Sequence, residues 1–171
     1  MKRLFFIAVL TVALLQNHLP FSLYGQERGF TWGAMANSSL LFNNFVPVNL
    51  EVITGYNFNS DFSLALKAEE NYSLFNESEN GSHYTNTVLG IMAKYNFYKF
   101  GNGILDARAG SGVTVTQKDW QYWYGDIGIY IKAGHETTKP TLGIGTRYYK
   151  SFGTFKSDYW RVYLSIGFTF N

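Results

Sequence analysis

The sequence has no cysteine, only three prolines and no marked excess of charge of either sign. The absence of cysteine excludes disulfide bonds, thiolate metal sites and cysteine nucleophiles. Lys2 and Arg3 account for two of the 14 basic residues, so the rest of the chain carries 12 basic groups against 12 acidic ones. A neutral chain lacks the basic patch that nucleic acids require, and we expect no nucleic-acid partner.

Long apolar runs are also scarce. One such run covers residues 4–15, follows Lys2 and Arg3, and leads into a polar segment that ends near Gly25. It is shorter than the roughly 20 residues that a membrane-spanning helix needs. This arrangement predicts a secretory signal at residues 1–25 and one exported domain at residues 26–171, with a retained N-terminal anchor as the alternative.

Aromatic residues, by contrast, make up 19% of the chain and accompany 17 glycines, a composition that favours β-structure over helix. Apolar and polar residues alternate with period two in eight segments, which indicates eight strands. In the clearest segment, every second residue from Trp160 to Phe170 is apolar. The expected strands are 30–36, 48–58, 62–69, 89–97, 105–113, 127–133, 142–149 and 160–170.

The links between these strands alternate in length. Short links are expected at 59–61, 98–102 and 135–140, and longer polar links at 38–47, 73–84, 115–121 and 151–158. An up-and-down antiparallel barrel places successive links at opposite ends, so that one rim is tight and the other carries the loops. The pattern therefore predicts an all-β fold built as an eight-stranded antiparallel barrel.

Alternation alone does not say which face of a barrel looks inward. Glycines between Gly55 and Gly167 fall on the polar face, where a crowded small lumen needs them and a solvated surface does not. We therefore predict a transmembrane barrel with a polar interior, and a soluble lipocalin-like barrel is the alternative. Charges on the inner face would have to pair, because isolated buried ions are costly. The expected lumen charge network is Glu51, Lys67, Glu69, Lys94, Asp106, Arg108, Asp126, Lys132, Arg147 and Arg161.

Aromatic residues gather at both ends of the strands, as they do at the two interfaces of a bilayer. The tight rim is expected to carry Tyr56, Phe58, Phe62, Tyr95, Phe97, Tyr98 and Phe100. The opposite rim is expected to carry Trp120, Tyr122, Trp123, Tyr124, Tyr148, Tyr149, Tyr159 and Trp160. The long links would face the cell exterior, with Phe42, Phe45, Phe75, Trp120, Phe152, Phe155 and Tyr159 near or above the lipid boundary.

The signal segment, the eight amphipathic strands, the aromatic rim and the C-terminal segment from Ser165 to Asn171 together resemble the small outer-membrane barrels of the OmpA and OmpX type. The resemblance covers nearly the whole exported chain and lies in architecture more than in motif. It implies a place in the outer membrane of a Gram-negative bacterium, contact with outer-membrane lipids and lipopolysaccharide, and insertion by the barrel assembly machinery. It also implies that the assembly signal lies on Ile166, Phe168 and Phe170.

Residues that could carry chemistry are few. His83 and His135 fall in predicted links at opposite rims, so we expect no metal site and no cofactor. The glycine pairs lie within strands, away from any strand-to-helix turn that could bind a nucleotide. The segment from His83 to Asn86 is loosely similar to one in outer-membrane lipid A deacylases, but Thr85 occupies the nucleophile position.

The sequence thus predicts a non-enzymatic outer-membrane barrel that contributes to envelope structure or meets a surface partner, as yet unidentified, through its outer loops. Two alternatives remain open. One is a narrow pore for small solutes, which a side-chain-filled lumen disfavours. The other is an enzyme that modifies lipid A.

Overall fold

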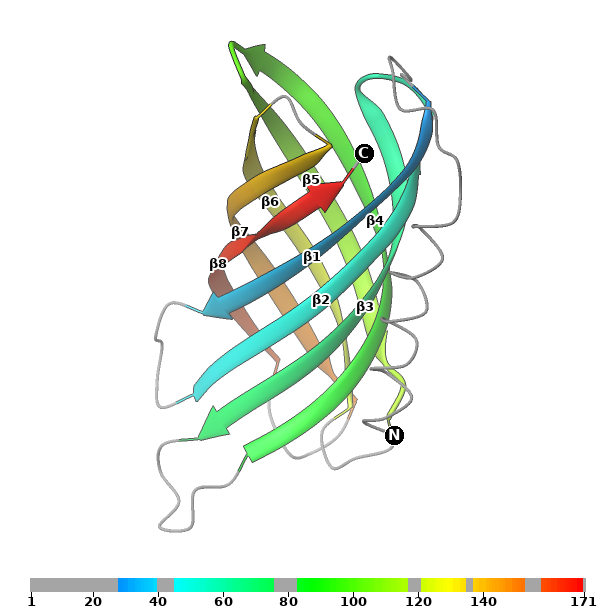
Figure 1. Cartoon of the computed structure of the whole chain (residues 1–171). Coiled ribbons are helices and arrows are strands. Elements are labelled where there is room, and N and C mark those ends of the chain that lie inside the picture. Colours follow the sequence, from blue (N-terminus) through cyan, green and yellow to red (C-terminus); the bar gives the residue numbers. More distant parts are fainter. Residues whose placement is uncertain are drawn as a thin grey trace.

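The structure, a computed structural model, describes residues 28–39, 45–75, 83–116, 121–134, 137–152 and 158–170. These form eight antiparallel strands in up-and-down order, and β1 pairs with β8 to close the barrel (Figure 1). The predicted all-β fold and strand number are therefore confirmed, whereas the predicted signal at residues 1–25 lies outside the described residues. The strands are β1 (Gly29–Ser39), β2 (Phe45–Asn57), β3 (Phe62–Phe75), β4 (His83–Phe100), β5 (Gly103–Thr114), β6 (Tyr122–Ala133), β7 (Thr138–Ser151) and β8 (Tyr159–Phe170).

The two ends of the barrel differ in their connections. At one end, here called the turn end, short links join β2 to β3, β4 to β5 and β6 to β7; β1 begins and β8 ends at this same end. The links at 40–44, 76–82, 115–121 and 152–158 define the opposite end, here called the loop end. The alternation of link lengths is thus confirmed.

Several strand ends differ from the sequence prediction. The link expected at 98–102 is reduced to Gly101 and Asn102, because β4 continues to Phe100. A register shift between Asn96 and Tyr98 makes this extension possible, since it inserts an extra residue into β4 opposite β5. Gly101 has a φ of 43°, a left-handed conformation that favours glycine in so tight a turn.

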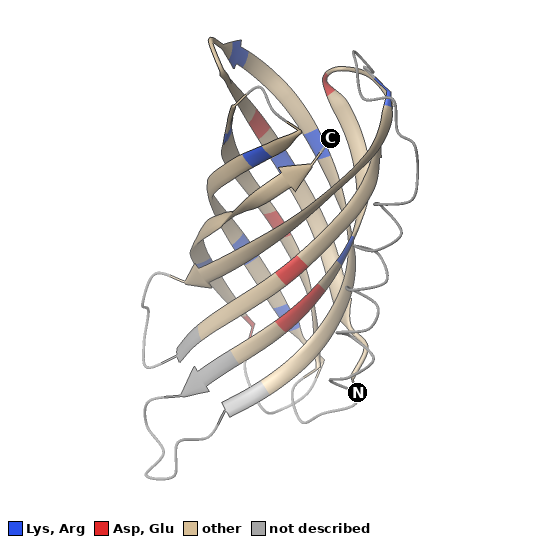
Figure 2. Ribbon diagram, in the orientation of Figure 1, with Lys and Arg blue, Asp and Glu red and all other residues tan. Residues whose placement is uncertain are grey.

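The two faces of the barrel have opposite polarity, and the inward or outward facing predicted for each strand is confirmed. Leu66 and Ile166, for example, are each 62% exposed on the outer face. The charged side chains of Glu69, Asp106 and Arg147 are instead buried in the lumen. Figure 2 shows Lys, Arg, Asp and Glu distributed along the whole height of the strands.

Glycines make room for the large side chains of the lumen. A β-carbon added at Gly143 would collide with the ring of Tyr130, and one added at Gly112 would lie 2.8 Å from the ring of Tyr124. Gly145 faces Tyr163 in the same way. The lumen is therefore filled by pairing a residue without a side chain with a tyrosine on a neighbouring strand, as a small barrel requires.

Within the described part of the chain, no helix is long and apolar enough to cross a membrane.

Candidate functional site in the polar lumen

The middle of the lumen holds a four-residue ionic cluster from three strands. Arg147 of β7 forms ion pairs with Glu69 of β3 at 2.7 Å and with Asp126 of β6 at 2.6 Å. Lys67 of β3 lies 3.4 Å from Glu69 and 3.2 Å from Asp126. Two cations thus bridge two carboxylates, and all four side chains are buried. We call this group the central cluster.

Aromatic and amide groups complete the surroundings of the central cluster. The Tyr124 hydroxyl donates to Glu69, and the Arg147 guanidinium lies over the Tyr124 ring at 3.7 Å from its centre. Asn49 of β2 donates to the second Glu69 oxygen at 3.0 Å. Both oxygens of Glu69 are therefore engaged by several donors, as a buried carboxylate requires.

A second ionic group lies toward the turn end. Arg108 donates to Asp106 through Nε at 2.6 Å and through Nη2 at 3.3 Å, and Lys132 lies 3.2 Å from the same carboxylate. The Arg108 guanidinium also stacks 3.9 Å from the centre of the Tyr130 ring. Lys94 lies on the neighbouring strand, where it is directly opposite Arg108 in register. We call these four charged residues the turn-end group.

Two further charges, Glu51 and Arg161, are held by neutral partners. Arg161 of β8 donates to Asn49 Oδ1 at 2.9 Å and to the Pro47 carbonyl oxygen at 3.3 Å. Glu51 accepts a hydrogen bond of 3.1 Å from Asn37, whose own side-chain oxygen accepts from Ser165. These bonds tie β8 and β1 to β2 across the lumen, so the polar contacts also link the strands where the barrel closes.

The ten residues of the expected lumen charge network all lie on the inner face, yet they are not all in ion pairs. Ion pairs join seven of them, in the central cluster and around Asp106. Among the described residues, Glu51, Lys94 and Arg161 form no ion pair within 4 Å. These three residues, two cations and one anion, have hydrogen bonds to neutral side chains instead.

The expected loop-end rim was partly wrong. Tyr122, Tyr124 and Tyr149 are buried in the lumen and pack around Val88, with Tyr159 packed against them. These rings fill the loop end of the lumen instead of facing lipid, because they lie on the same strand faces as the lumen charges. Their positions in the period-two alternation could have predicted from the sequence that they face the lumen.

Other aromatic residues do lie on the exterior. At the turn end, the side chains expected at the tight rim are exposed: Tyr56, Phe58, Phe62, Tyr95, Phe97, Tyr98 and Phe100. At the loop end, Trp123, Phe152 and Trp160 are exposed and Tyr148 is half-buried. The expectations for Phe42, Trp120 and Phe155 fall outside the described residues, as do the side chains of Phe45 and Phe75.

Exposed ion pairs lie at both rims. Lys99 is 3.1 Å from Asp61, and hydrogen bonds from Ser60 and Lys99 hold the pKa of Asp61 below its usual value. At the loop end, Lys150 lies 2.7 Å from Asp158. Hydrogen bonds from Lys150 and from the backbone N–H of Ser151 lower the pKa of Asp158. Both pairs are in contact with solvent, so each contributes little to stability.

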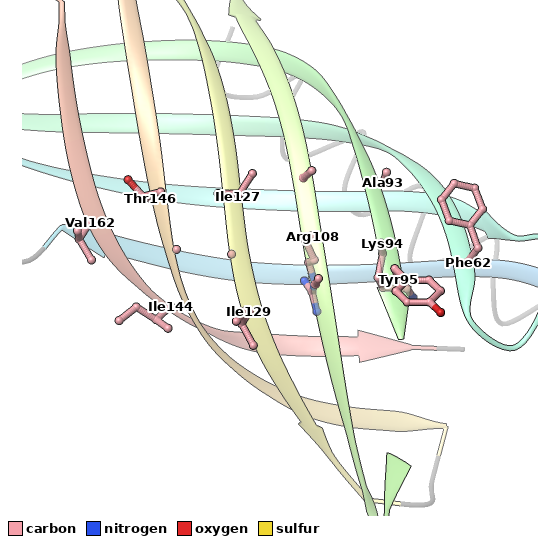
Figure 3. Close-up of a pocket in the computed structure, with 14 residues that line it drawn as sticks. Phe62, Ala93, Lys94, Tyr95, Arg108, Ile127, Ile129, Ile144, Thr146 and Val162 are labelled. Atoms are coloured by element: carbon pink, nitrogen blue, oxygen red, sulfur yellow. The ribbon is translucent and has the colours of Figure 1, made fainter. Parts of the chain in front are cut away.

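An open groove of about 570 Å³ runs over strands β3 to β8 (Figure 3). In Figure 3, Phe62 and Tyr95 lie at one end of the groove and Val162 at the other. The small side chains Ala93, Ala107 and Ala109 lie beside the bulkier Tyr95, Ile127 and Ile129 and create the depression. Its lining is mostly apolar, and it also includes Lys94 and Arg108 of the inner face.

The residues considered for chemistry do not come together in one pocket. Asn86 is buried in the lumen, whereas Thr85, next to it in β4, lies on the opposite face of the strand. The His83 side chain and His135 fall outside what the structure describes. Among the described residues, no group of three or more His, Asp or Glu side chains could hold a metal ion.

Comparisons with known proteins gave one structural neighbour of note. No protein-family model matches the chain. No curated protein matches it either. Among solved structures, the N-terminal β-barrel domain of Pseudomonas aeruginosa OprF is similar to 85% of this chain and 99% of that chain. The sequence identity is 18% and the TM-score is 0.48.

Proposed function

We propose that this chain is a β-barrel protein of the bacterial outer membrane, and that its role is non-enzymatic. The observation that carries the proposal is the inverted polarity of the barrel. Large apolar side chains such as Leu66, Ile91 and Ile127 are more than half exposed on the outside, while ten charged side chains are buried inside. In water, an apolar belt around the whole molecule would far exceed the patch that soluble monomers tolerate.

In a bilayer, an apolar exterior and a charged interior are energetically favourable. The apolar exterior is then in contact with hydrocarbon. Because β1 pairs with β8, the backbone groups of neighbouring strands can hydrogen-bond to one another around the closed sheet. The exposed aromatic residues at the turn end supply amphipathic rings at one interface. The apolar face of β8, which includes Ile166, Phe168 and Phe170, is then available to the assembly machinery as a membrane-insertion signal.

The packed lumen favours a structural or surface-binding role over transport. The central cluster crosses the barrel from β3 to β7, and Arg147 within it is only 1% exposed. A solute would have to break several ion pairs to pass. We accordingly propose that the protein contributes to envelope structure and that its loop end meets lipopolysaccharide or a surface partner.

The test is the orientation and location of the barrel in cells. A protease site is inserted in the β3–β4 link at residues 76–82, and a matched control carries the same site between Gly101 and Asn102 at the turn end. We expect the protein in the outer-membrane fraction, with cleavage of the first site in intact cells. The control site should be cut only after the outer membrane is opened.

Recovery of the protein in a soluble fraction would refute the membrane proposal. Cleavage of only the control site in intact cells would mean that the barrel is inserted in the reverse orientation. Single-channel recordings of the purified protein distinguish the proposal from the pore alternative. A closed lumen predicts no steady conductance, and a pore predicts one. Lipid A from cells with and without the protein is also compared. The non-enzymatic proposal predicts that the two have the same structure, whereas an enzyme that modifies lipid A predicts a difference.

A further inference from the structure

Positive charge accumulates at the turn end of the lumen. Figure 2 shows Lys and Arg bands on several strands in the half of the barrel that holds the C-terminus, and others in the opposite half. The turn-end group contains three cations, Lys94, Arg108 and Lys132, and one carboxylate, Asp106. Lys139 of β7 adds a fourth, half-buried cation on the same inner face.

Among the described residues, Lys94 forms no ion pair with the single carboxylate of the group. Asp106 Oδ1 accepts from Arg108 Nε, and Oδ2 accepts from Arg108 Nη2 and lies 3.2 Å from Lys132. Within the part of the chain that the structure describes, the Lys94 ammonium has one hydrogen-bond partner, Asn57 Oδ1, at the long distance of 3.5 Å. Only 5% of the Lys94 surface is exposed. A buried ammonium with three donors and one weak neutral acceptor is far from satisfied.

Lys94 lies near the turn-end mouth of the barrel. Asn57 is the last residue of β2, and Ser63, the register partner of Lys94, is the second residue of β3. Lys132 contacts Asn96, which lies two residues from Lys94 on the same face of β4. The two lysines therefore lie near the same part of the turn end, where Ser63 and Thr141 are their register partners on the neighbouring strands.

We propose that the turn end of the lumen binds a small oxyanion of the phosphate type, held by Lys94 and Lys132. The anion supplies the counter-charge that Asp106 cannot give, and its several oxygens match the free donors of the two ammonium groups. Lys132 uses two contacts, to Asp106 and Asn96, and so retains one donor. This inference goes beyond the proposed function and depends only on the closed barrel, so it stands or falls separately.

The experiment uses the chain embedded in zwitterionic lipid discs in a chloride buffer of constant ionic strength. Inorganic phosphate is titrated while thermal unfolding and 31P NMR line width are recorded. We expect phosphate to raise the Tm, and the Lys94→Gln variant to bind phosphate about tenfold more weakly or worse, because charged hydrogen bonds carry most of the affinity. The matched control is Lys99→Gln, which removes an exposed lysine of the same strand and should bind like the parent.

A second variant tests the missing counter-charge directly. Asn57→Asp places a carboxylate where an amide oxygen now contacts Lys94, without removing any cation. We expect it to raise the Tm in the absence of phosphate and to abolish the phosphate-dependent increase. Because this variant adds a favourable pair, loss of binding in it cannot be ascribed to failure to fold.

Discs that contain phosphatidylglycerol, without free phosphate, distinguish the source of the anion. A rise in Tm with inorganic phosphate alone assigns the site to free phosphate from the aqueous phase. A Lys94-dependent rise with phosphatidylglycerol assigns it to a lipid headgroup that reaches the mouth. The proposal is overturned if the parent responds to neither, or if Lys94→Gln and Asn57→Asp respond like the parent.

Discussion

Replacing Arg147 by methionine removes the cation that joins two buried carboxylates of the lumen. Arg147 contacts Glu69 at 2.7 Å and Asp126 at 2.6 Å. After its removal, Lys67, at 3.4 Å and 3.2 Å, is left as the cation that faces both. Methionine keeps the apolar stem of the side chain but lacks the guanidinium, so the change removes the charge and its donors together. Breaking a buried ion pair by removing one partner costs about 3–5 kcal/mol, and we expect a loss in this range.

The measurement is urea-induced unfolding in lipid vesicles, followed by tryptophan fluorescence. A loss of this size is a large part of a typical stability of about 5–15 kcal/mol, so the midpoint should fall clearly while the barrel still folds. Lys150→Met is the matched control, because Lys150 lies on the same strand in an exposed pair with Asp158. It should cost about 0–1 kcal/mol.

A loss below about 1 kcal/mol for Arg147→Met, equal to the control, would refute this reasoning. It would mean that water solvates the central cluster and that the lumen is hydrated through its middle. A further check is the double variant Glu69→Gln with Arg147→Met. Since the two residues are in contact, the loss should be smaller than the sum of the single losses.

Three further outcomes are expected. Ile166→Arg should cost about 2–4 kcal/mol in the same unfolding assay if the site lies near the bilayer midplane. Gly143→Ala should cost about 1–3 kcal/mol, because its β-carbon collides with the Tyr130 ring. Gly125→Ala, whose β-carbon would meet only the far edge of a tryptophan ring at 3.3 Å, should cost less than Gly143→Ala. NMR titration should show that the lowered pKa of Asp158 favours the folded state above the ordinary aspartate pKa, with this contribution lost as pH falls through the lowered value.

Strand identity and facing could be predicted from the sequence because both follow from a period of two. The alternation from Trp160 to Phe170 needs no knowledge of neighbouring strands, and the same holds for the other seven segments. The ends of strands could not be predicted as well. β4 continues to Phe100 because its register shift is set by pairing with β5, which the sequence of β4 alone does not contain.

The candidate site, too, could be predicted from the sequence only in part. Alternation was enough to place the ten charges on the inner face. Which charges pair, and that Lys94 does not, depends on register and on side-chain reach between strands that are far apart in sequence. The tyrosines at 122, 124 and 149 were assigned to the loop-end rim by residue type, although their alternation pointed inward. Residue type was therefore the weaker guide, since tyrosine suits both a membrane interface and a crowded polar interior.

Closure by the first and last strands makes the barrel an all-or-none structure. The Thr31 hydroxyl of β1 donates to the Phe170 carbonyl of β8, a residue 139 positions further along the chain. No earlier segment can take the place of β8, so an incomplete chain has two open sheet edges with unpaired backbone groups. Such edges pair readily with other chains, and in hydrocarbon they have no water to satisfy them. A truncation of even one strand should therefore give aggregates, and no partly active protein.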